Sequence, residues 1–439
     1  MKKTLTTICS FLTTLTLVFG QKNYEQNVTV STFAGSTTSG STNGQGSLAR
    51  FLSPYGVTID AIGNMYVADA GNHSIRKITQ SGLVSTLAGS WITGSADGWG
   101  SSASFFNPTG VAIDGSGNVY VADNSNHLIR KITPDGLVST LAGSAKTRGD
   151  DNGQGSLARF YFPSGVAVDS IGKVYVADDR NYSIRKITPG GLVSTLAGYS
   201  YGSADGQGSL AGFFHPGGVA VDRLGNVYVA DQGNNKIRKI TPGGLVSTLA
   251  GSNTSGTADG QGSLASFNSP TGVSVDGKGN VYVADAGNNL IRKITPGGLV
   301  STLAGSTTLG SADGQGSLAS FNYPTGVSVD ALGNVYVADY KNHLIRKITI
   351  GSSTGIVNDI NSSFINIFPN PAQNILNLSL SEEVNATISL IDMQGGTMLS
   401  QVINGNTAQL NSSNLSNGVY ILKVVTEKSS YTKQVIIAK

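Results

Sequence analysis

The sequence predicts an all-β protein in which one short unit is repeated six times. The tetrapeptide Tyr-Val-Ala-Asp recurs in register, and its tyrosines are Tyr66, Tyr120, Tyr175, Tyr228, Tyr282 and Tyr336. Successive copies are 54, 55, 53, 54 and 54 residues apart. A fixed period of roughly 40 to 55 residues that contains several short strands is typical of radially repeated all-β folds.

Each copy contains four short strand-like runs, which in the second copy span residues 110–114, 118–123, 128–133 and 138–143. The runs are rich in Val, Ile, Tyr and Thr and are bounded by Gly, Pro, Asn and Asp, as strands between tight turns are. No stretch has a sustained period of 3.6 residues, so we expect no long helix. Four antiparallel strands in each of six units predict a six-bladed β-propeller.

The closure of the ring can also be predicted. The sixth copy stops after its third strand, at Thr349, and the missing fourth phrase stands at the start of the chain as residues 28–35. We therefore expect the N-terminal strand to complete the last blade, which leaves no unpaired strand edge at the seam. The propeller is predicted to span residues 28–349.

The repeated phrases resemble those of the NHL repeat family. They are Phe-x-x-Pro-x-Gly-Val-x-x-Asp, Gly-Asn-Val-Tyr-Val-Ala-Asp and Asn-His-x-Ile-Arg-Lys-Ile, and all three occur within residues 321–348. The resemblance covers residues 28–349 and implies a six-bladed ring.

The chain begins with an expected signal peptide, residues 1–20. Lys2 and Lys3 precede an apolar run at residues 8–19, which is too short to span a membrane, and no later segment qualifies as a transmembrane helix. The only cysteine, Cys9, lies in this segment. We therefore expect the mature protein to have no disulfide, thiol nucleophile or thiolate metal site.

The composition argues against a nucleic-acid partner, although the NHL family includes RNA-binding members. Removing Lys2 and Lys3 lowers the formal net charge from +3 to +1, and charged residues make up 13% of the chain. Phosphate binding needs a concentrated basic face. A near-neutral exported chain does not offer one.

A change of composition after Thr349 predicts a second domain. Residues 350–363 read as a polar linker. Residues 364–439 contain about seven strand-like runs, which predict a small β-sandwich.

This domain resembles the C-terminal sorting domain of type IX secretion cargo from Bacteroidota. The matching features are Pro-Asn-Pro at residues 369–371, the Gly-Val-Tyr strand at residues 418–420 and a final strand that contains lysine. The resemblance implies that the type IX secretion machinery handles residues 364–439 and exports the protein to the medium or the outer cell surface. An accessory carbohydrate-binding or Ig-like domain is the alternative.

Polar residues that recur once in every copy are interpreted as scaffold. One Asp and one Arg per blade predict buried ion pairs: Asp69, Asp123, Asp178, Asp231, Asp285 and Asp339 with Arg76, Arg130, Arg185, Arg238, Arg292 and Arg346. A second aspartate opens each hairpin turn, where its side chain is expected to accept backbone amides; these are Asp60, Asp114, Asp169, Asp222, Asp276 and Asp330.

Three histidines, His73, His127 and His343, occupy one repeat position on neighbouring blades. They suggest zinc, as in amidating lyases with a similar ring. However, the position opens the third strand, two spacings of about 4.8 Å from the innermost strand, so we expect the side chains to lie more than roughly 10 Å apart. Zinc needs nitrogens about 2.1 Å from one centre, so we predict a structural role and no metal. His215 is expected alone near the channel mouth.

The phrase Asp-Gly-Gln-Gly, at residues 205–208, 259–262 and 313–316, lacks the alternating oxygen ligands of a calcium loop and favours a glycine turn. No Ser-His-Asp set, carboxylate pair or phosphate-binding glycine loop stands apart from the repeats. The sequence therefore predicts no catalytic residue, metal site or cofactor.

The copies differ mainly in two loop types, which a propeller places together around one mouth of its channel. One connects an outer strand to the next blade, and the other links the second and third strands. Exposed aromatic and basic residues there are typical of a binding patch. The predicted ligand-binding residues are Trp91, Trp99, Lys146, Arg148, Arg180, Tyr182, Tyr201 and Tyr340.

We interpret the protein as a secreted or surface-attached module that binds an extracellular protein or glycan through the loop face of blades 1 to 3. One alternative is an extracellular lyase or hydrolase with its site at the channel mouth. Sequence drift in exposed loops, or a passive structural stalk, would also explain the repeats.

Overall fold

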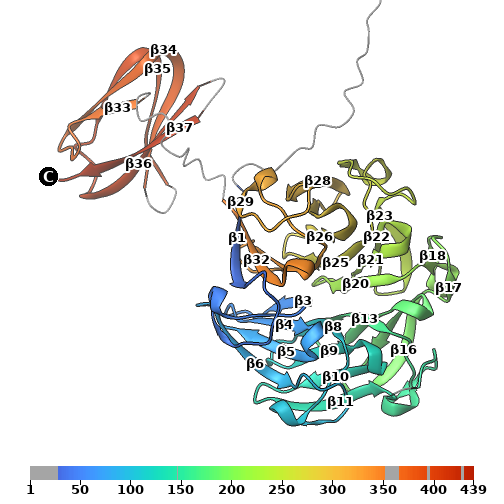
Figure 1. Ribbon diagram of the computed structural model, residues 1–439. Helices are drawn as coiled ribbons and strands as arrows, with labels where there is room; N and C mark the ends of the chain where they lie inside the picture. The colour runs from blue at the N-terminus through green and yellow to red at the C-terminus, as the bar shows by residue number, and fades with distance from the viewer. Residues whose placement is uncertain (1–27, 146, 352–364, 393–395, 427–429) are drawn as a thin grey trace, which may run out of the picture. The chain divides into compact units, whose positions relative to one another are not determined.

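The computed structural model describes residues 28–145, 147–351, 365–392, 396–426 and 430–439 (Figure 1). The chain forms two compact units, with the boundary after Ile350. The expected signal peptide, residues 1–20, and nearly all of the expected linker, residues 350–363, lie outside the described residues.

The first unit is a six-bladed propeller, and each blade is a five-stranded antiparallel sheet. The innermost strands are β3 (Pro54–Ile59), β8 (Pro108–Ile113), β13 (Pro163–Val168), β20 (Pro216–Val221), β25 (Pro270–Val275) and β30 (Pro324–Val329). The second strands are β4 (Met65–Asp69), β9 (Val119–Asp123), β14 (Val174–Asp178), β21 (Val227–Asp231), β26 (Val281–Asp285) and β31 (Val335–Asp339). The third strands are β5 (Ser74–Ile78), β10 (Leu128–Ile132), β15 (Ser183–Ile187), β22 (Lys236–Ile240), β27 (Leu290–Ile294) and β32 (Leu344–Ile350).

Two more strands complete each blade on its outer side. The fourth strands are β6 (Leu83–Gly89), β11 (Leu137–Gly143), β16 (Leu192–Ala197), β23 (Leu245–Gly251), β28 (Leu299–Ala304) and, for blade 6, β1 (Val28–Gly35). The fifth strands are β2 (Gly44–Gln45), β7 (Gly98–Trp99), β12 (Gly153–Gln154), β18 (Gly206–Gln207), β24 (Gly260–Gln261) and β29 (Gly314–Gln315). An additional parallel pair, β17 (Ser200–Tyr201) with β19 (Gly212–Phe213), lies between blades 3 and 4.

Short 3-10 helices connect these strands. One follows each fifth strand: η1 (Gly46–Leu48), η3 (Gly100–Ser102), η5 (Gly155–Leu157), η7 (Gly208–Leu210), η9 (Gly262–Leu264) and η11 (Gly316–Leu318). Another links each second and third strand: η2 (Ala70–Asn72), η4 (Asn124–Asn126), η6 (Asp179–Asn181), η8 (Gln232–Asn234), η10 (Ala286–Asn288) and η12 (Tyr340–Asn342). No helix in the described part of the chain is long and apolar enough to cross a membrane.

The fifth strand corrects the prediction of four strands per blade. In the fourth blade, Gly206 and Gln207 pair with the start of β23, and Gln207 Nε2 donates to the Gly243 carbonyl at 2.6 Å. Gly208, at φ +53°, then turns the chain inward. The Asp-Gly-Gln-Gly phrase is therefore a glycine turn that adds an edge strand. Two residues are too short to show the alternation from which strands are predicted.

The ring closes as predicted, through the N-terminal strand. β1 pairs with β32 from Val28 opposite Ile350 to Gly35 opposite Leu344, and Figure 1 shows the two strands side by side. The innermost strands also meet around the axis at a glycine in each blade. A Cβ on Gly110 would lie 2.7 Å from the Ser164 carbonyl oxygen in the next blade.

The core consists of layers between neighbouring blades. All five residues of β9 are buried. Tyr120 packs with Phe160 of the third blade, whereas Val119 and Val121 pack with Tyr66 of the first. Each second strand is therefore apolar on both faces, which is why its phrase is nearly continuous Val, Tyr and Ala.

The second unit is a sheet of five described strands: β33 (Ile365–Phe368), β34 (Ile375–Ile391), β35 (Thr397–Asn411), β36 (Gly418–Thr426) and β37 (Ser430–Ile437). About seven strands were predicted. Two predicted runs, residues 375–380 and 386–392, join in β34, where the pairing with β35 shifts between Ser379 and Val384. The polar residues between the runs stay extended and exposed, so they interrupt the apolar alternation without ending the strand.

Candidate functional site

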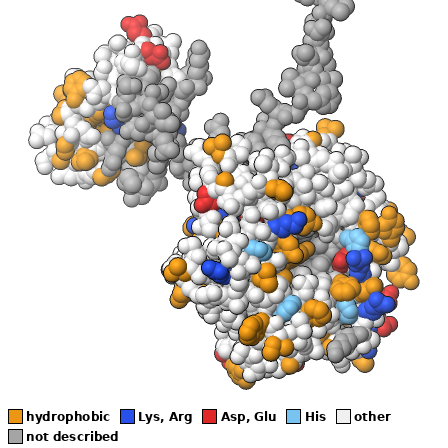
Figure 2. Space-filling model, viewed as in Figure 1, with side chains coloured by type: hydrophobic (Ala, Val, Ile, Leu, Met, Phe, Trp, Pro, Cys, Tyr) orange, Lys and Arg blue, Asp and Glu red, His pale blue; other side chains and the backbone are white. Residues whose placement is uncertain are grey.

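One end of every blade contributes to a surface that we call the mouth face. In the second blade, Pro108 pairs with Asp123, Asp123 with Leu128, and Leu128 with Gly143. The start of the innermost strand, the link between the second and third strands and the end of the outer strand therefore lie at the same end. The two variable loop types therefore both begin on this face, although the connection between blades also reaches the opposite end of the blade. Figure 2 shows hydrophobic, basic and histidine side chains around its central hollow.

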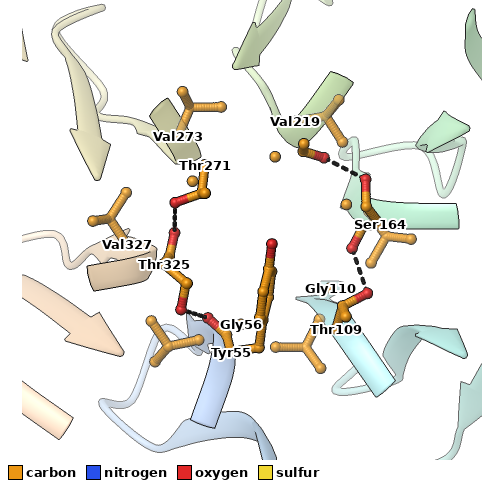
Figure 3. Close-up of a pocket in the computed structure, with 18 residues that line it drawn as sticks. Tyr55, Gly56, Thr109, Gly110, Ser164, Val219, Thr271, Val273, Thr325 and Val327 are labelled. Carbon is orange, nitrogen blue, oxygen red and sulfur yellow. Dashed lines mark hydrogen bonds between the residues drawn. The ribbon is translucent and has the colours of Figure 1, made fainter. Parts of the chain in front are cut away.

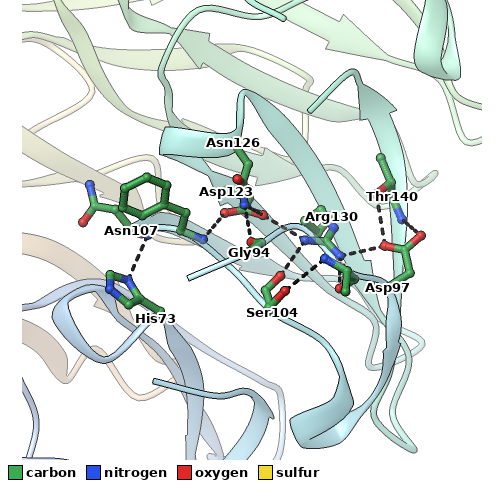
Figure 4. Close-up of polar contacts among 11 residues, drawn as sticks. His73, Gly94, Asp97, Ser104, Asn107, Asp123, Asn126, Arg130 and Thr140 are labelled. Atoms are coloured by element: carbon green, nitrogen blue, oxygen red, sulfur yellow. Dashed lines mark hydrogen bonds and ion pairs between the residues drawn. The ribbon is translucent and has the colours of Figure 1, made fainter. Parts of the chain in front are cut away.

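Buried ion pairs hold the loops of the mouth face in place (Figure 4). Arg130 Nη1 lies 2.8 Å from Asp123 Oδ2, and Arg130 Nη2 lies 2.6 Å from Asp97 Oδ1. The Asp123 carboxylate also accepts from the side chain of Asn126 and the backbone of Phe106, each at 2.8 Å. The predicted Asp–Arg pair is present in all six blades.

Sequence reasoning missed the second partner of each arginine, which comes from the segment before the fifth strand. It is a carboxylate in four blades and an amide in two: Asp97, Asp205, Asp259 and Asp313, and Asn43 and Asn152. Burial raises the pKa of the Asp123 carboxyl to about 6, although the Arg130 guanidinium opposes this shift. The Asp-Gly-Gln-Gly aspartates thus pair with arginine.

The three aligned histidines link neighbouring blades. The Nδ1 atom of each accepts a backbone N–H that precedes the next innermost strand: His73 from Asn107 at 3.2 Å, His127 from Phe162 at 3.2 Å and His343 from Ser53 at 3.1 Å. Asn235 and Asn289 accept the equivalent N–H in blades 4 and 5, at 2.8 and 2.9 Å. This supports the predicted structural role. Within the described residues, no group of three or more His, Cys, Asp or Glu side chains could hold a metal.

The junction of blades 3 and 4 differs, because Tyr182 occupies the position of the linking histidine or asparagine. Here His215 Nδ1 lies 2.6 Å from Asp179 Oδ1, at the start of η6. The expectation that His215 stands alone is therefore wrong, since the ring brings a residue from the preceding blade to it. Burial raises the pKa of Asp179, while His215 and Arg180 oppose this shift. Such a pair can bind a polar ligand or exchange a proton.

An aromatic cluster covers the same junction and consists of Tyr182, Tyr201, Phe214 and His215. The ring centroids of Tyr201 and Phe214 lie 4.6 Å apart, and Tyr182 lies 6.1 Å from Tyr201 and 5.9 Å from His215. The β17–β19 pair holds Tyr201 in place, yet the Tyr201 side chain remains 64% exposed. The cluster therefore offers aromatic surface to a ligand.

A single tyrosine, Tyr55, points into the channel axis (Figure 3). The other five blades carry small residues at this position: Thr109, Ser164, Gly217, Thr271 and Thr325. They line, with Tyr55, an axial cavity of about 60 Å³. Thr325 Oγ1 donates to the backbone carbonyl of Tyr55 at 2.8 Å, and Thr109 Oγ1 donates to that of Ser164 at 2.8 Å, so hydroxyls also join innermost strands.

Tyr55 packs against aromatic residues of blade 6. Its ring lies 5.9 Å from Tyr340, which lies 6.3 Å from Tyr323, and Lys341 Nζ lies 5.0 Å from the centroid of the Tyr323 ring. Burial, and to a lesser extent Tyr323, Asp179 and Tyr340, raises the pKa of the Tyr55 phenol. The phenol therefore stays protonated at neutral pH and can donate a hydrogen bond.

The structure separates the predicted ligand-binding residues into groups. Arg180, Tyr182 and Tyr201 meet at the junction of blades 3 and 4, where Arg180 Nε lies 3.8 Å from Asp179 Oδ2. Tyr340 lies beside Tyr55. Arg148 lies at the junction of blades 2 and 3, where it donates to the Tyr161 hydroxyl at 3.0 Å and lies 5.0 Å from the centroid of that ring. Lys146 is outside the described residues.

The two tryptophans do not share a site. Trp91 follows β6 at the mouth end and is 79% exposed. Trp99 lies in β7 and pairs with Leu137, at the opposite end of the outer strand from Gly143. The placement of Trp99 on the mouth face was therefore wrong. The connection between blades runs the full height of the blade, so residues in one loop can lie at opposite ends.

Tyr55, Phe214 and Tyr323 were missed. Tyr55 departs from the small residues of the other copies, whereas Phe214 and Tyr323 lie at two positions that vary from copy to copy. This variation next to the recurring proline is the signal that could have found them. Such a comparison of copies must include the ends of the strands as well as the loops.

Two family models match the chain. The NHL repeat matches residues 105–132, 160–187, 213–240, 267–294 and 321–348, in blades 2 to 6. The Secretion system C-terminal sorting domain matches residues 366–438. This domain indicates export by the type IX secretion system to the cell surface or the extracellular space.

Two curated relatives are similar in sequence to this chain. The protein SUPPRESSOR OF QUENCHING 1, chloroplastic, of Arabidopsis thaliana is 31% identical over 265 residues, which are 56% of this chain and 25% of the relative. NHL repeat-containing protein 2 of Bos taurus is 30% identical over 345 residues, which are 69% and 47% of the two chains. The chain therefore spans about a quarter to about half the length of these relatives.

Solved structures from Bacteroides have a similar fold. A protein of unknown function from Bacteroides thetaiotaomicron is 23% identical, with a TM-score of 0.58 and coverage of 74% of this chain and 76% of the other. An auxiliary nutrient binding protein from Bacteroides ovatus is 18% identical, with a TM-score of 0.57 and coverage of 74% and 78%. At these identities the likeness concerns the fold alone. The chain therefore contains five matched NHL repeats within a six-bladed β-propeller, followed by a type IX secretion sorting domain at residues 366–438.

Proposed function

We propose that the protein is a binding module that takes an extracellular protein or glycan ligand on its mouth face. The observation that carries this proposal is the concentration of departures from the repeat on the mouth face. Tyr55 enters the axis where other blades have small residues, and Tyr182, Asp179 and His215 replace the linking contact at one junction. Ligands are commonly bound by aromatic and polar side chains that converge on one surface of a rigid scaffold.

The position of the cluster refines the binding surface that the sequence suggests. It moves the centre from blades 1 to 3 towards the aromatic cluster of blades 3 and 4 and the Tyr55–Tyr340 contact of blades 1 and 6. Arg180, with a side chain that is 49% exposed, adds a hydrogen-bond donor beside the cluster. The Bacteroides propeller described as an auxiliary nutrient binding protein is compatible with this role.

The test is a screen of the secreted protein on glycan and surface-protein arrays, with variants that restore the residue of other copies. Tyr55→Thr reproduces Thr109, and Tyr182→Asn reproduces Asn235, so both should fold. We expect a ligand of the wild-type protein to lose at least about tenfold in affinity with either variant. Leu224→Ser, at an 80% exposed hairpin tip on the other face, is the control and should bind normally. Equal binding by all four proteins would place the site elsewhere.

The Asp179–His215 pair favours a second candidate, an extracellular lyase or hydrolase at the same mouth. A histidine paired with a carboxylate 2.6 Å away can act as a general base, and the Tyr55 phenol is a hydrogen-bond donor. His215→Ser reproduces Ser53 and Ser269 of the repeat. If an array ligand is consumed by the wild-type protein, this variant should abolish turnover and still bind. Binding without turnover supports the module.

We also propose that residues 1–20 are removed on export and that residues 350–363 link the propeller to the sorting domain, residues 364–439. N-terminal sequencing and intact mass of the exported protein test both boundaries. A mature N-terminus at residue 21 is expected.

A further inference from the structure

A groove beside blade 1 is separate from the aromatic cluster and from the Tyr55 contacts. It has a volume of about 320 Å³ and is lined by Ser41, Asn72, Ser74, Thr86, Gly89, Ser90, Trp91 and Ser101. Volumes of this order, roughly 300 to 1,000 Å³, are usual for sites that bind small molecules. The lining comes from the chain before blade 1, from η2 and β5, from β6, and from η3 of the next blade. Four segments of a rigid scaffold therefore shape the groove.

The chemistry of the lining is uniform. Apart from Trp91 and Gly89, every lining residue carries a neutral hydroxyl or amide, and none carries a charge. Asn72 and Ser74 are buried, at 8% and 5% exposure, whereas the Trp91 side chain is 79% exposed. The groove thus combines one aromatic wall with several groups that can donate or accept hydrogen bonds.

These features match a neutral sugar ring. One face of many pyranoses presents C–H groups that pack on an indole, and the ring edge presents hydroxyls that donate and accept. A charged ligand would find no counter-ion among the lining residues. A protein partner would find a single aromatic side chain among small polar residues, without the apolar centre that a protein interface usually buries.

The repeat provides an internal comparison. Trp91 is the third residue after the Ala of its Leu-Ala-Gly phrase, where other copies have Thr37, Ala145, Ser200, Asn253 and Thr307. The fold accepts small residues there, so the packing of the blades does not require the indole. An exposed indole at this one position calls for a role outside the scaffold.

We propose that the Trp91 groove is a binding site for a neutral pyranose unit of an extracellular glycan, in addition to the ligand of the mouth face. The proposal does not depend on the mouth site, because none of the lining residues belongs to the Asp179–His215 pair, the aromatic cluster or the Tyr55 contacts.

The fluorescence of Trp91 allows a direct test, because the protein has two tryptophans. In a Trp99→Phe variant of the exported protein, Trp91 is the only indole. We would titrate this variant with neutral gluco-, manno-, xylo- and N-acetylglucosamine hexasaccharides and, as a contrast, with a galacturonate hexasaccharide. We expect a saturable shift or quench of the emission with at least one neutral oligosaccharide and none with the acidic one.

Calorimetry with the same oligosaccharide separates this site from the mouth. Trp91→Thr, which reproduces Thr307, should weaken binding at least about tenfold, whereas Tyr182→Asn should leave it unchanged. No saturable response to any neutral oligosaccharide at millimolar concentration would overturn the proposal. So would binding that survives Trp91→Thr, a preference for the acidic chain, or a protein ligand whose binding requires Trp91. If Tyr182→Asn weakens binding of the oligosaccharide and Trp91→Thr does not, the oligosaccharide binds at the mouth site and the proposal for this groove is wrong.

Discussion

At the scale of single residues, two blades differ in how many carboxylates surround the same buried arginine. Arg185 has one carboxylate partner, Asp178 at 2.7 Å, and its second partner is the amide of Asn152. Arg238 has two carboxylates, Asp231 at 2.6 Å and Asp205 at 2.7 Å. Both guanidinium groups are fully buried. Removing the first carboxylate therefore leaves Arg185 without a counter-charge and leaves Arg238 with one.

We predict that Asp178→Asn lowers the free energy of unfolding of the propeller by about 3 to 5 kcal/mol. Asp231→Asn should lower it clearly less. Chemical denaturation at about pH 8 measures both, because burial raises the pKa of Asp178 to about 6 and the carboxylate is then ionised. Equal losses would show that the 48% exposed Asp205 carboxylate does not compensate Arg238.

The linking histidines predict acid sensitivity. Burial lowers the pKa of His73, His127 and His343 from the ordinary value of 6.5. The unfolded chain therefore takes up protons before the folded one as the pH falls. Their contribution to stability is complete above about pH 6.5 and is lost progressively below it.

A variant with all three histidines replaced by Asn isolates this contribution, because Asn235 and Asn289 already form the same link. Between about pH 7.5 and about pH 5.5, we expect the Tm of the wild-type protein to fall more than the Tm of the variant. The buried aspartates titrate in both proteins, so they cancel in the comparison. Parallel Tm curves would contradict the prediction.

At the scale of the element, the innermost strand depends on one glycine. A Cβ on Gly110 would lie 2.7 Å from the Ser164 carbonyl oxygen and 2.8 Å from the Val166 nitrogen. Backbone of a neighbouring strand cannot move aside as a flexible side chain can. The repeated Pro-x-Gly-Val phrase therefore sets the distance between blades.

We predict that Gly110→Ala lowers the stability of the propeller by about 1 to 3 kcal/mol, as overpacking does. Gly115→Ala is the control, because a Cβ there meets nothing within 4 Å and its backbone is not in the left-handed region. Thermal unfolding of the two variants should separate them. Gly115→Ala should be neutral or slightly stabilising, because Ala restricts the unfolded chain more than Gly does. A loss of the same size in Gly115→Ala would contradict close packing as the cause at Gly110.

At the scale of the whole molecule, the propeller and the sorting domain are separate compact units with separate cores. The sorting-domain core, with Ile388, Leu390, Leu422 and Val435, includes no propeller residue. Export can therefore depend on the second unit without any change in the fold of the first.

We predict that deletion of residues 366–438 prevents the protein from reaching the cell surface or the medium and leaves a folded propeller inside the cell envelope. Cell fractionation with detection of the propeller measures this outcome. The Tm of the propeller should be unchanged. Export of the shortened chain at the normal level would refute a sorting role for this domain.

Sequence by itself determined the architecture: six units, ring closure by residues 28–35, one Asp–Arg pair per blade and a separate C-terminal domain. These features depend on the alternation of apolar and polar residues within each strand and on a period that repeats in register. Both can be read directly from the order of residues along the chain. The alternation of apolar and polar residues did not predict the fifth strand of each blade, such as Gly98–Trp99, because that strand has only two residues. It also divided β34 in two, because polar residues within β34 remain extended.

Tertiary structure alone decided which variable residues meet. The Asp179–His215 pair joins residues 36 apart, and the link from Ser53 to His343 joins residues 290 apart. The path of each connecting loop separates Trp99 from Trp91 although only a few residues lie between them. Such contacts depend on the radius of the ring and the course of its loops. These are properties of all six blades packed together, and no single copy of the repeat contains them.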